Sequence, residues 1–161
     1  MTASLVLRDA TPDDAGLIAG FVRDLADYEK LLHEAVATEA DFADAIARGH
    51  IASLIAELDG VPVGFALWFH TFSTFLGKRG LYLEDLYVQP AHRGHGIGKA
   101  IFRDLARRAQ EAGCVRMEWS VLDWNAPSIA FYRSIGAKPM DEWTVQRLDV
   151  AEIAKLAQQE A

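Results

Sequence analysis

Hydrophobic residues recur along the chain with two periods, one typical of helices and one typical of strands. Residues 11–30 contain an apolar stripe at helical spacing, so we expect an amphipathic helix there. Its members are Leu17, Ile18, Phe21, Val22 and Leu25. Thr11 and Pro12 suit the first turn of this helix, and Thr38 and Gly49 suit the two ends of a second helix over residues 38–49.

Four short apolar runs, residues 5–10, 51–58, 61–72 and 80–90, are typical of strands. Asp59 and Gly60 separate the second run from the third, and both residue types tolerate positive φ. This pair predicts an antiparallel hairpin. Pro90 ends the fourth run because it has no amide hydrogen for a ladder.

A glycine-rich stretch follows, and beyond it the pattern predicts alternating helices and strands. We expect a helix that ends at Gly113 and packs with Ile97, Ile101, Leu105 and Ala109. Residues 115–122 alternate as a strand, residues 125–137 suit a short helix and residues 143–150 suit a last strand. The predicted fold is α/β, or mixed α+β, with the glycines inside a right-handed βαβ crossover.

Length and charge narrow the class of protein. The 161 residues suit one domain, residues 1–161, and the net charge of -7 disfavours nucleic acid and anionic membranes as partners. A cationic small molecule is the more natural partner. The single cysteine, the lack of a signal-peptide pattern and the lack of a long apolar run lead us to expect a cytoplasmic protein.

The glycine-rich stretch, "RGHGIGKA", has the chemistry of a phosphate cradle. Glycines at positions 94, 96 and 98 expose backbone amides at a helix start, and Arg93 and Lys99 add positive charge. A P-loop is disfavoured because its first glycine and its hydroxyl residue are missing, and a dinucleotide loop is disfavoured because its third glycine is missing. An ordinary flexible turn remains the alternative.

Four blocks of sequence, in order, carry a resemblance to a known family. They are residues 5–30, the run "LYLEDLYV", the stretch "RGHGIGKAIF" and the segment "WNAPSIAFYRSIGA", followed by a tryptophan in "EWTVQRLD". Together they resemble the GNAT family of N-acetyltransferases, and most of all its diamine (spermidine/spermine) and thialysine acetyltransferase branch. The resemblance implies a central mixed, mostly antiparallel sheet flanked by helices, with acetyl-CoA held in the βαβ crossover.

The same resemblance implies direct acetyl transfer, in a ternary complex, to the primary amine of a diamine, a polyamine or a thialysine-like amino acid. It also implies a homodimer. Two other functions stay open: a non-catalytic acyl-CoA sensor, and an acetyltransferase of protein or peptide amino groups. No metal is expected, because His92 and His95 lack a cluster of further ligands.

The resemblance assigns roles to particular residues. Glu84 would bind the amine and accept its proton through water, and Tyr132 would protonate the departing thiolate. The expected acetyl-CoA residues are Leu86, Tyr87, Val88, Arg93, Gly94, His95, Gly96, Ile97, Gly98, Lys99, Asn125 and Ser128. The expected substrate residues are Tyr28, Glu29, Glu84, Asp85 and Trp143.

The residues themselves leave alternatives to these roles. Strand alternation would place Glu84 and Asp85 on opposite faces, so only one would face a given cleft, and both could instead be a solvated pair on an edge strand. Tyr132 could be a core residue of its helix. Trp143 could be a strand residue buried in the core or at an interface.

Overall fold

The computed structural model describes residues 2–159, which divide into two compact units between Leu122 and Asp123. The first unit contains a five-stranded sheet with its covering helices. The second unit contains two short helices, α4 (Ala126–Ser134) and α5 (Val150–Ala157).

The sheet of the first unit runs in the order β1-β2-β3-β4-β5. The first four strands are antiparallel neighbours, and β5 pairs parallel to β4. Their bounds are β1 Leu5–Asp9, β2 Ala52–Leu58, β3 Val61–Ser73, β4 Lys78–Val88 and β5 Met117–Glu118. The predicted mixed and mostly antiparallel sheet is confirmed, and the parallel β4-α3-β5 connection is the expected crossover.

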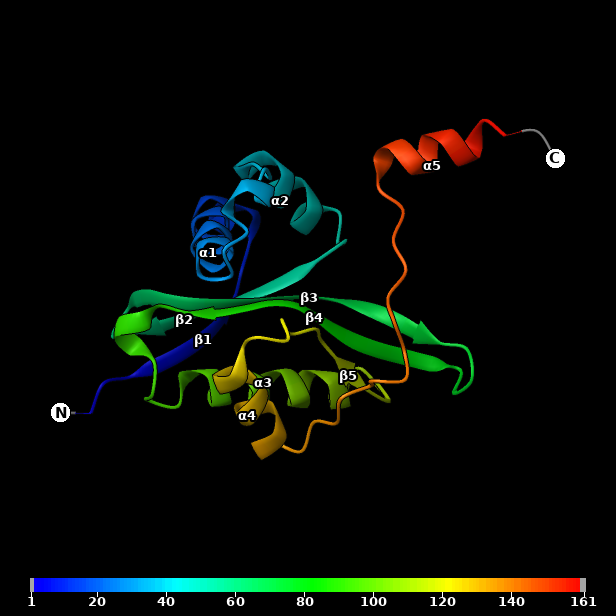
Figure 1. The fold of residues 1–161 in the computed structure, drawn as a ribbon. Coiled ribbons are helices and arrows are strands. Elements are labelled where there is room, and N and C mark those ends of the chain that lie inside the picture. Colours follow the sequence, from blue (N-terminus) through cyan, green and yellow to red (C-terminus); the bar gives the residue numbers. More distant parts are fainter. Residues whose placement is uncertain (1, 160–161) are drawn as a thin grey trace. The chain divides into compact units, whose positions relative to one another are not determined.

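Helices cover both faces of this sheet, as Figure 1 shows. α1 (Ala15–Tyr28) and α2 (Glu39–Ala47) lie on one face, and α3 (Ile97–Glu111) lies on the other. Three single-turn helices complete the unit: η1 Pro12–Asp14, η2 Leu32–Glu34 and η3 Pro90–His92. The main core lies under α1, where Phe21 stacks on Phe65 with ring centroids 5.5 Å apart.

The local signals in the sequence act as expected. The Thr38 hydroxyl accepts the Asp41 amide at the start of α2, and Asp59 and Gly60 turn the β2–β3 hairpin with φ of 51° and 80°. Gly113 has φ of 71° just beyond α3. The predicted core face of α3 is confirmed, since Ile97, Ile101, Leu105 and Ala109 are all buried.

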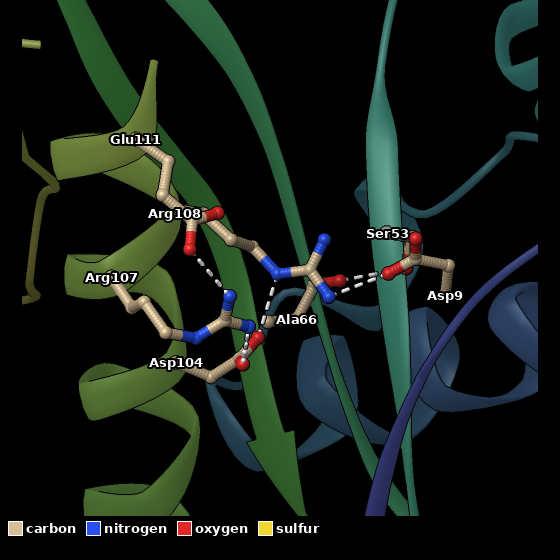
Figure 2. Close-up of polar contacts among 7 residues, drawn as sticks. All are labelled: Asp9, Ser53, Ala66, Asp104, Arg107, Arg108 and Glu111. Carbon is tan, nitrogen blue, oxygen red and sulfur yellow. Dashed lines mark hydrogen bonds and ion pairs between the residues drawn. The ribbon is translucent and has the colours of Figure 1, made fainter. Parts of the chain in front are cut away.

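A network of arginines and carboxylates holds α3 on the sheet (Figure 2). The Arg108 guanidinium donates to Asp104 at 2.6 Å and to Asp9 of β1 at 2.5 Å, and it lies 5.2 Å from the centroid of the Trp68 ring. The helix that starts at the glycine-rich loop is therefore anchored near its other end.

In the same view the Ser53 hydroxyl donates to the Ala66 carbonyl of β3 at 2.7 Å.

Two of the predicted strands differ from the structure: one is much shorter than predicted, and the other is not a strand. Residues 115–122 form only the short β5, because their pairing with β4 stops at Tyr82, just before an irregularity in β4. Residues 143–149 have no strand partner within the part of the chain that the structure describes, and α5 begins at Val150. A strand needs a neighbour for its backbone groups, and the alternation of apolar residues does not supply one.

Within residues 2–159, no helix combines the length and the apolar character that crossing a bilayer requires.

Candidate functional site

The glycine-rich loop joins η3 to α3 and has a left-handed backbone at two positions. Gly94 and Gly96 both have φ of 80°, a conformation that residues with a Cβ rarely adopt, and Gly96 is the N-cap of α3. A Cβ at Gly98 would meet nothing within 4 Å, so the space beside the first turn is open. The backbone of the loop is therefore accessible to a ligand.

The start of α3 offers unpaired amides to such a ligand. The first helical hydrogen bond runs from the Ala100 amide to the Gly96 carbonyl at 2.9 Å, so the amides of residues 97–99 have no acceptor within the helix. Ile97 is buried, which leaves only its backbone for binding, whereas Lys99 and His95 are exposed. This arrangement suits an anion such as a pyrophosphate.

The side chain of Arg93 contacts residues of α1 and β4. Its Nε donates to the Val88 carbonyl at 2.8 Å, and its guanidinium carbon lies 4.8 Å from the Tyr28 ring centroid and 5.3 Å from that of Tyr87. From the sequence we expected Arg93 to add positive charge to the phosphate-binding glycine loop. The structure brings it together with Tyr28 and Tyr87.

β4 is irregular at Glu84. Leu67 of β3 pairs with Asp85 and Trp68 pairs with Leu83, which leaves Glu84 as an extra residue between two pairs. The strand is therefore not regular at Glu84 and Asp85, where the sequence predicts plain alternation. An extra residue bends a strand and redirects its side chains, and functional sites often use this device.

Three carboxylates gather at this irregularity. Asp85 pairs with Leu67, which belongs to the core cluster under α1. Glu29 directly follows the last residue of α1. Burial, and then the charges of Glu84 and Glu29, raise the pKa of Asp85 from 3.8 to about 6. Burial also raises the pKa of Glu29. A cation bound here would relieve the repulsion among these groups.

The end of β4 is packed tightly between β3 and α1. Tyr87 is buried with its ring centroid 6.2 Å from that of Phe21, and Val88 pairs with Gly64. A Cβ at Gly64 would lie 2.5 Å from the Tyr87 carbonyl oxygen, so only glycine fits there. The isolated glycine inside a strand is the sequence signal for this close approach, and our reading of the sequence missed it.

The remaining predicted site residues belong to the second unit. Asn125 is buried and caps α4, where its Oδ1 accepts the Ser128 amide at 3.4 Å. The ring of Tyr132, on α4, lies 5.8 Å from that of Phe131. Trp143 is 77% exposed, so the alternative that it is buried in the core of this chain is wrong.

The chemistry of the first unit fits an anionic ligand beside a cationic one. The helix start and the open glycine backbone suit the phosphates of a coenzyme, and the three carboxylates suit an amine. Among residues 2–159, His, Cys, Asp and Glu do not form a group of three or more arranged to hold a metal ion.

Comparisons with known proteins agree with this reading. The family model for the acetyltransferase (GNAT) family matches residues 19–137. A thialysine N-epsilon-acetyltransferase of Sus scrofa is 37% identical over 150 residues, which cover 87% of this chain and 88% of the relative.

Two solved structures have a similar fold. An integron cassette protein from V. cholerae has a TM-score of 0.80 and 25% identity, with 97% of this chain and 99% of that chain covered. An aminoglycoside N-acetyltransferase in complex with CoA has a TM-score of 0.73 and 19% identity, with 92% and 97% covered. The matched region includes the irregular strand, the glycine loop and α3, and on this evidence the chain belongs to the acetyltransferase (GNAT) family and is an acyltransferase.

Proposed function

We propose that the protein transfers the acetyl group of acetyl-CoA directly to a primary amine of a small cationic substrate, such as a diamine, a polyamine or a thialysine-like amino acid. The observation that carries this proposal is the group of three carboxylates formed by Glu84 and Asp85, in the strand that leads into the glycine loop, and Glu29, at the end of α1. The name of the Sus scrofa relative, a thialysine N-epsilon-acetyltransferase, supports an amine of this class.

The donor is proposed to bind at the glycine loop. When bound, acetyl-CoA supplies an activated acetyl group on sulfur. Backbone amides at the start of α3 would hold its phosphates, with Gly94, Gly96 and Gly98 allowing close approach and His95 and Lys99 beside them. Leu86, Tyr87 and Val88 would contribute backbone groups, since the Tyr87 side chain is buried. The CoA complex of the structural neighbour supports this donor.

The amine must lose a proton before it can attack the acetyl group. An alkylamine of pKa about 10.4 is neutral about once in 2,500 molecules at pH 7, which corresponds to about 4.6 kcal/mol. Glu84 is proposed to bind the ammonium group and to pass its proton on, through water. Asp85, whose pKa is raised to about 6, can share that proton near neutral pH.

Carboxylates beside an amine also have an opposing effect. They favour the ammonium form and so raise the pKa of the bound amine. The repulsion among Glu29, Glu84 and Asp85 limits this effect, because a proton taken up by the group relieves the repulsion. The same three residues can therefore capture a cation and accept its proton.

We also propose roles for four residues of the second unit. Tyr132 would donate a proton to the departing thiolate, and Asn125 and Ser128 would contact the coenzyme in addition to forming the start of α4. Trp143, with its exposed ring, would pack against the cationic substrate. The protein is proposed to work as one domain over residues 1–161, as a homodimer, and in the cytoplasm.

The test is thiol release from acetyl-CoA with purified protein and a panel of amines: putrescine, spermidine, thialysine, lysine and peptides with a free amino terminus. We expect the fastest turnover with a small amine that carries a second cationic group. Tyr132→Phe should lower kcat with little change in the affinity for CoA, and Glu84→Gln should lower kcat/KM for the amine.

Two other outcomes are informative. Calorimetric binding of CoA without turnover of any amine would favour an acyl-CoA sensor, and turnover of peptides alone would favour an acetyltransferase of protein amino groups. Light scattering tests the homodimer.

A further inference from the structure

Arg93 lies at the junction of three segments that would serve different substrates. It immediately precedes Gly94 of the glycine loop, its Nε donates to the carbonyl of Val88 at the end of β4, and its guanidinium lies against Tyr28, the last residue of α1. The loop belongs to the proposed acetyl-CoA side. Tyr28 and the adjacent Glu29 belong to the proposed amine side.

The contacts of Arg93 involve residues that are packed into the sheet. Tyr87, the second ring beside the guanidinium, is buried against Phe21, which in turn stacks on Phe65 of β3. The Val88 carbonyl that accepts from Arg93 lies in the β3–β4 ladder opposite Gly64. Tyr28, by contrast, is 38% exposed, so its contact with Arg93 links an exposed ring to these packed residues of the sheet.

The contacts also demand an arginine. A guanidinium can donate from Nε in one direction and present its flat face to an aromatic ring at the same time. The ammonium group of a lysine is a compact charge on a flexible stem and cannot do both. Because its Nε donates to the Val88 carbonyl and a face of its guanidinium lies against the Tyr28 ring, the Arg93 side chain is oriented toward protein groups.

We propose that Arg93 is a positioning residue that couples the two substrates: it orders the glycine loop and the Tyr28–Glu29 corner together, so that each substrate binds more tightly once the other is bound. This inference rests on the proposed function for the identity of the amine, and its first readout, the binding of CoA, does not depend on turnover. The alternative is that the Arg93 guanidinium binds a phosphate directly.

The variants Arg93→Met, Tyr28→Leu and the double variant separate these possibilities, with CoA dissociation constants measured by calorimetry. Positioning predicts that each single change weakens CoA binding about threefold to fivefold, and that the double variant is no weaker than a single one, since both remove the same contact. Arg103→Met is the matched control, because Arg103 is an exposed arginine on α3.

Kinetics with the best amine of the panel give the second readout. Positioning predicts a higher KM for the amine in Arg93→Met and in Tyr28→Leu with kcat nearly unchanged, and a partial effect in Arg93→Lys. If Tyr28→Leu leaves CoA binding unchanged while Arg93→Met weakens it, Arg93 is a phosphate ligand and the inference is overturned. Additive losses in the double variant, or no loss in either single variant, also overturn it.

A wild-type protein that acetylates no amine of the panel would refute the proposed function alone. The CoA dissociation constants of the two single variants and the double variant would still decide the role of Arg93. Should Arg93→Met fail to fold, Tyr28→Leu tests the same contact from an exposed position on α1.

Discussion

Replacing Asp85 with asparagine removes a carboxyl group that the folded protein holds beside Glu84 and Glu29. Its pKa is raised from 3.8 to about 6 by burial and by those two charges. The unfolded chain therefore releases this proton more readily than the folded one does. Protonated Asp85 therefore contributes to the free energy of unfolding. This contribution is fully present below pH 3.8 and is lost as the pH rises through about 6.

The magnitude follows from the two pKa values. Ionising Asp85 should cost the folded state about 0.6 kcal/mol at pH 4 and about 3 kcal/mol at pH 7. Asparagine is nearly the same size and carries no charge, so Asp85→Asn should raise the free energy of unfolding by up to about 3 kcal/mol at pH 7 and by much less at pH 4. The gain should be smaller in a Glu29→Gln background, where one source of repulsion is missing.

The assay is urea unfolding followed by tryptophan fluorescence at several values between about pH 4 and 8, with wild-type protein and variant measured side by side. Asp141→Asn, at an exposed position, is the matched control. A stability difference for Asp85→Asn that is equal at both ends of the pH range would refute the reasoning. So would a loss of stability at pH 7.

The remaining predictions concern packing around the site and are each tested by thermal unfolding of a matched pair. Gly64→Ala should destabilise the protein by about 1–3 kcal/mol, because its Cβ would lie 2.5 Å from the Tyr87 carbonyl, whereas Gly20→Ala, in open space on α1, should stabilise it by up to about 1 kcal/mol. Equal effects would contradict the close approach of β3 and β4. Arg108→Leu should cost about 1–3 kcal/mol because it leaves Asp104 and Asp9 without their bridge, while Arg107→Leu, which loses more exposed ion pairs, should cost less. The reverse order would show that Arg108 does not anchor α3.

Much of the fold was predictable because its signals are local. The start of α2 at Thr38, the Asp59–Gly60 hairpin and the end of α3 near Gly113 depend on the preferences of a few neighbouring residues, and the structure confirms them. The buried face of α3 followed from helical spacing alone. The last strand, predicted over residues 143–150, failed because strand formation also depends on a partner elsewhere in the chain.

The candidate site was predictable in its parts and not in their arrangement. The left-handed glycines, Gly94 and Gly96, could be foreseen because glycine adopts that backbone at low cost. The extra residue at Glu84 could not, since it arises from the register between β3 and β4. The contact of Arg93 with Tyr28 joins segments far apart in the chain, and no local pattern encodes it.

The sequence by itself determined the helix ends and the hairpin turn that local signals mark, the residues that form the loop for an anion, and the family to which the chain belongs. Those features rest on local conformational preference and on residue types at fixed spacing. Only the tertiary structure decided that Asp85 shares its surroundings with Glu84 and Glu29, and that Arg93 lies against Tyr28 and Tyr87. The reason is physical: burial and the approach of distant charges set a pKa and orient a side chain, and both exist only once the chain is packed.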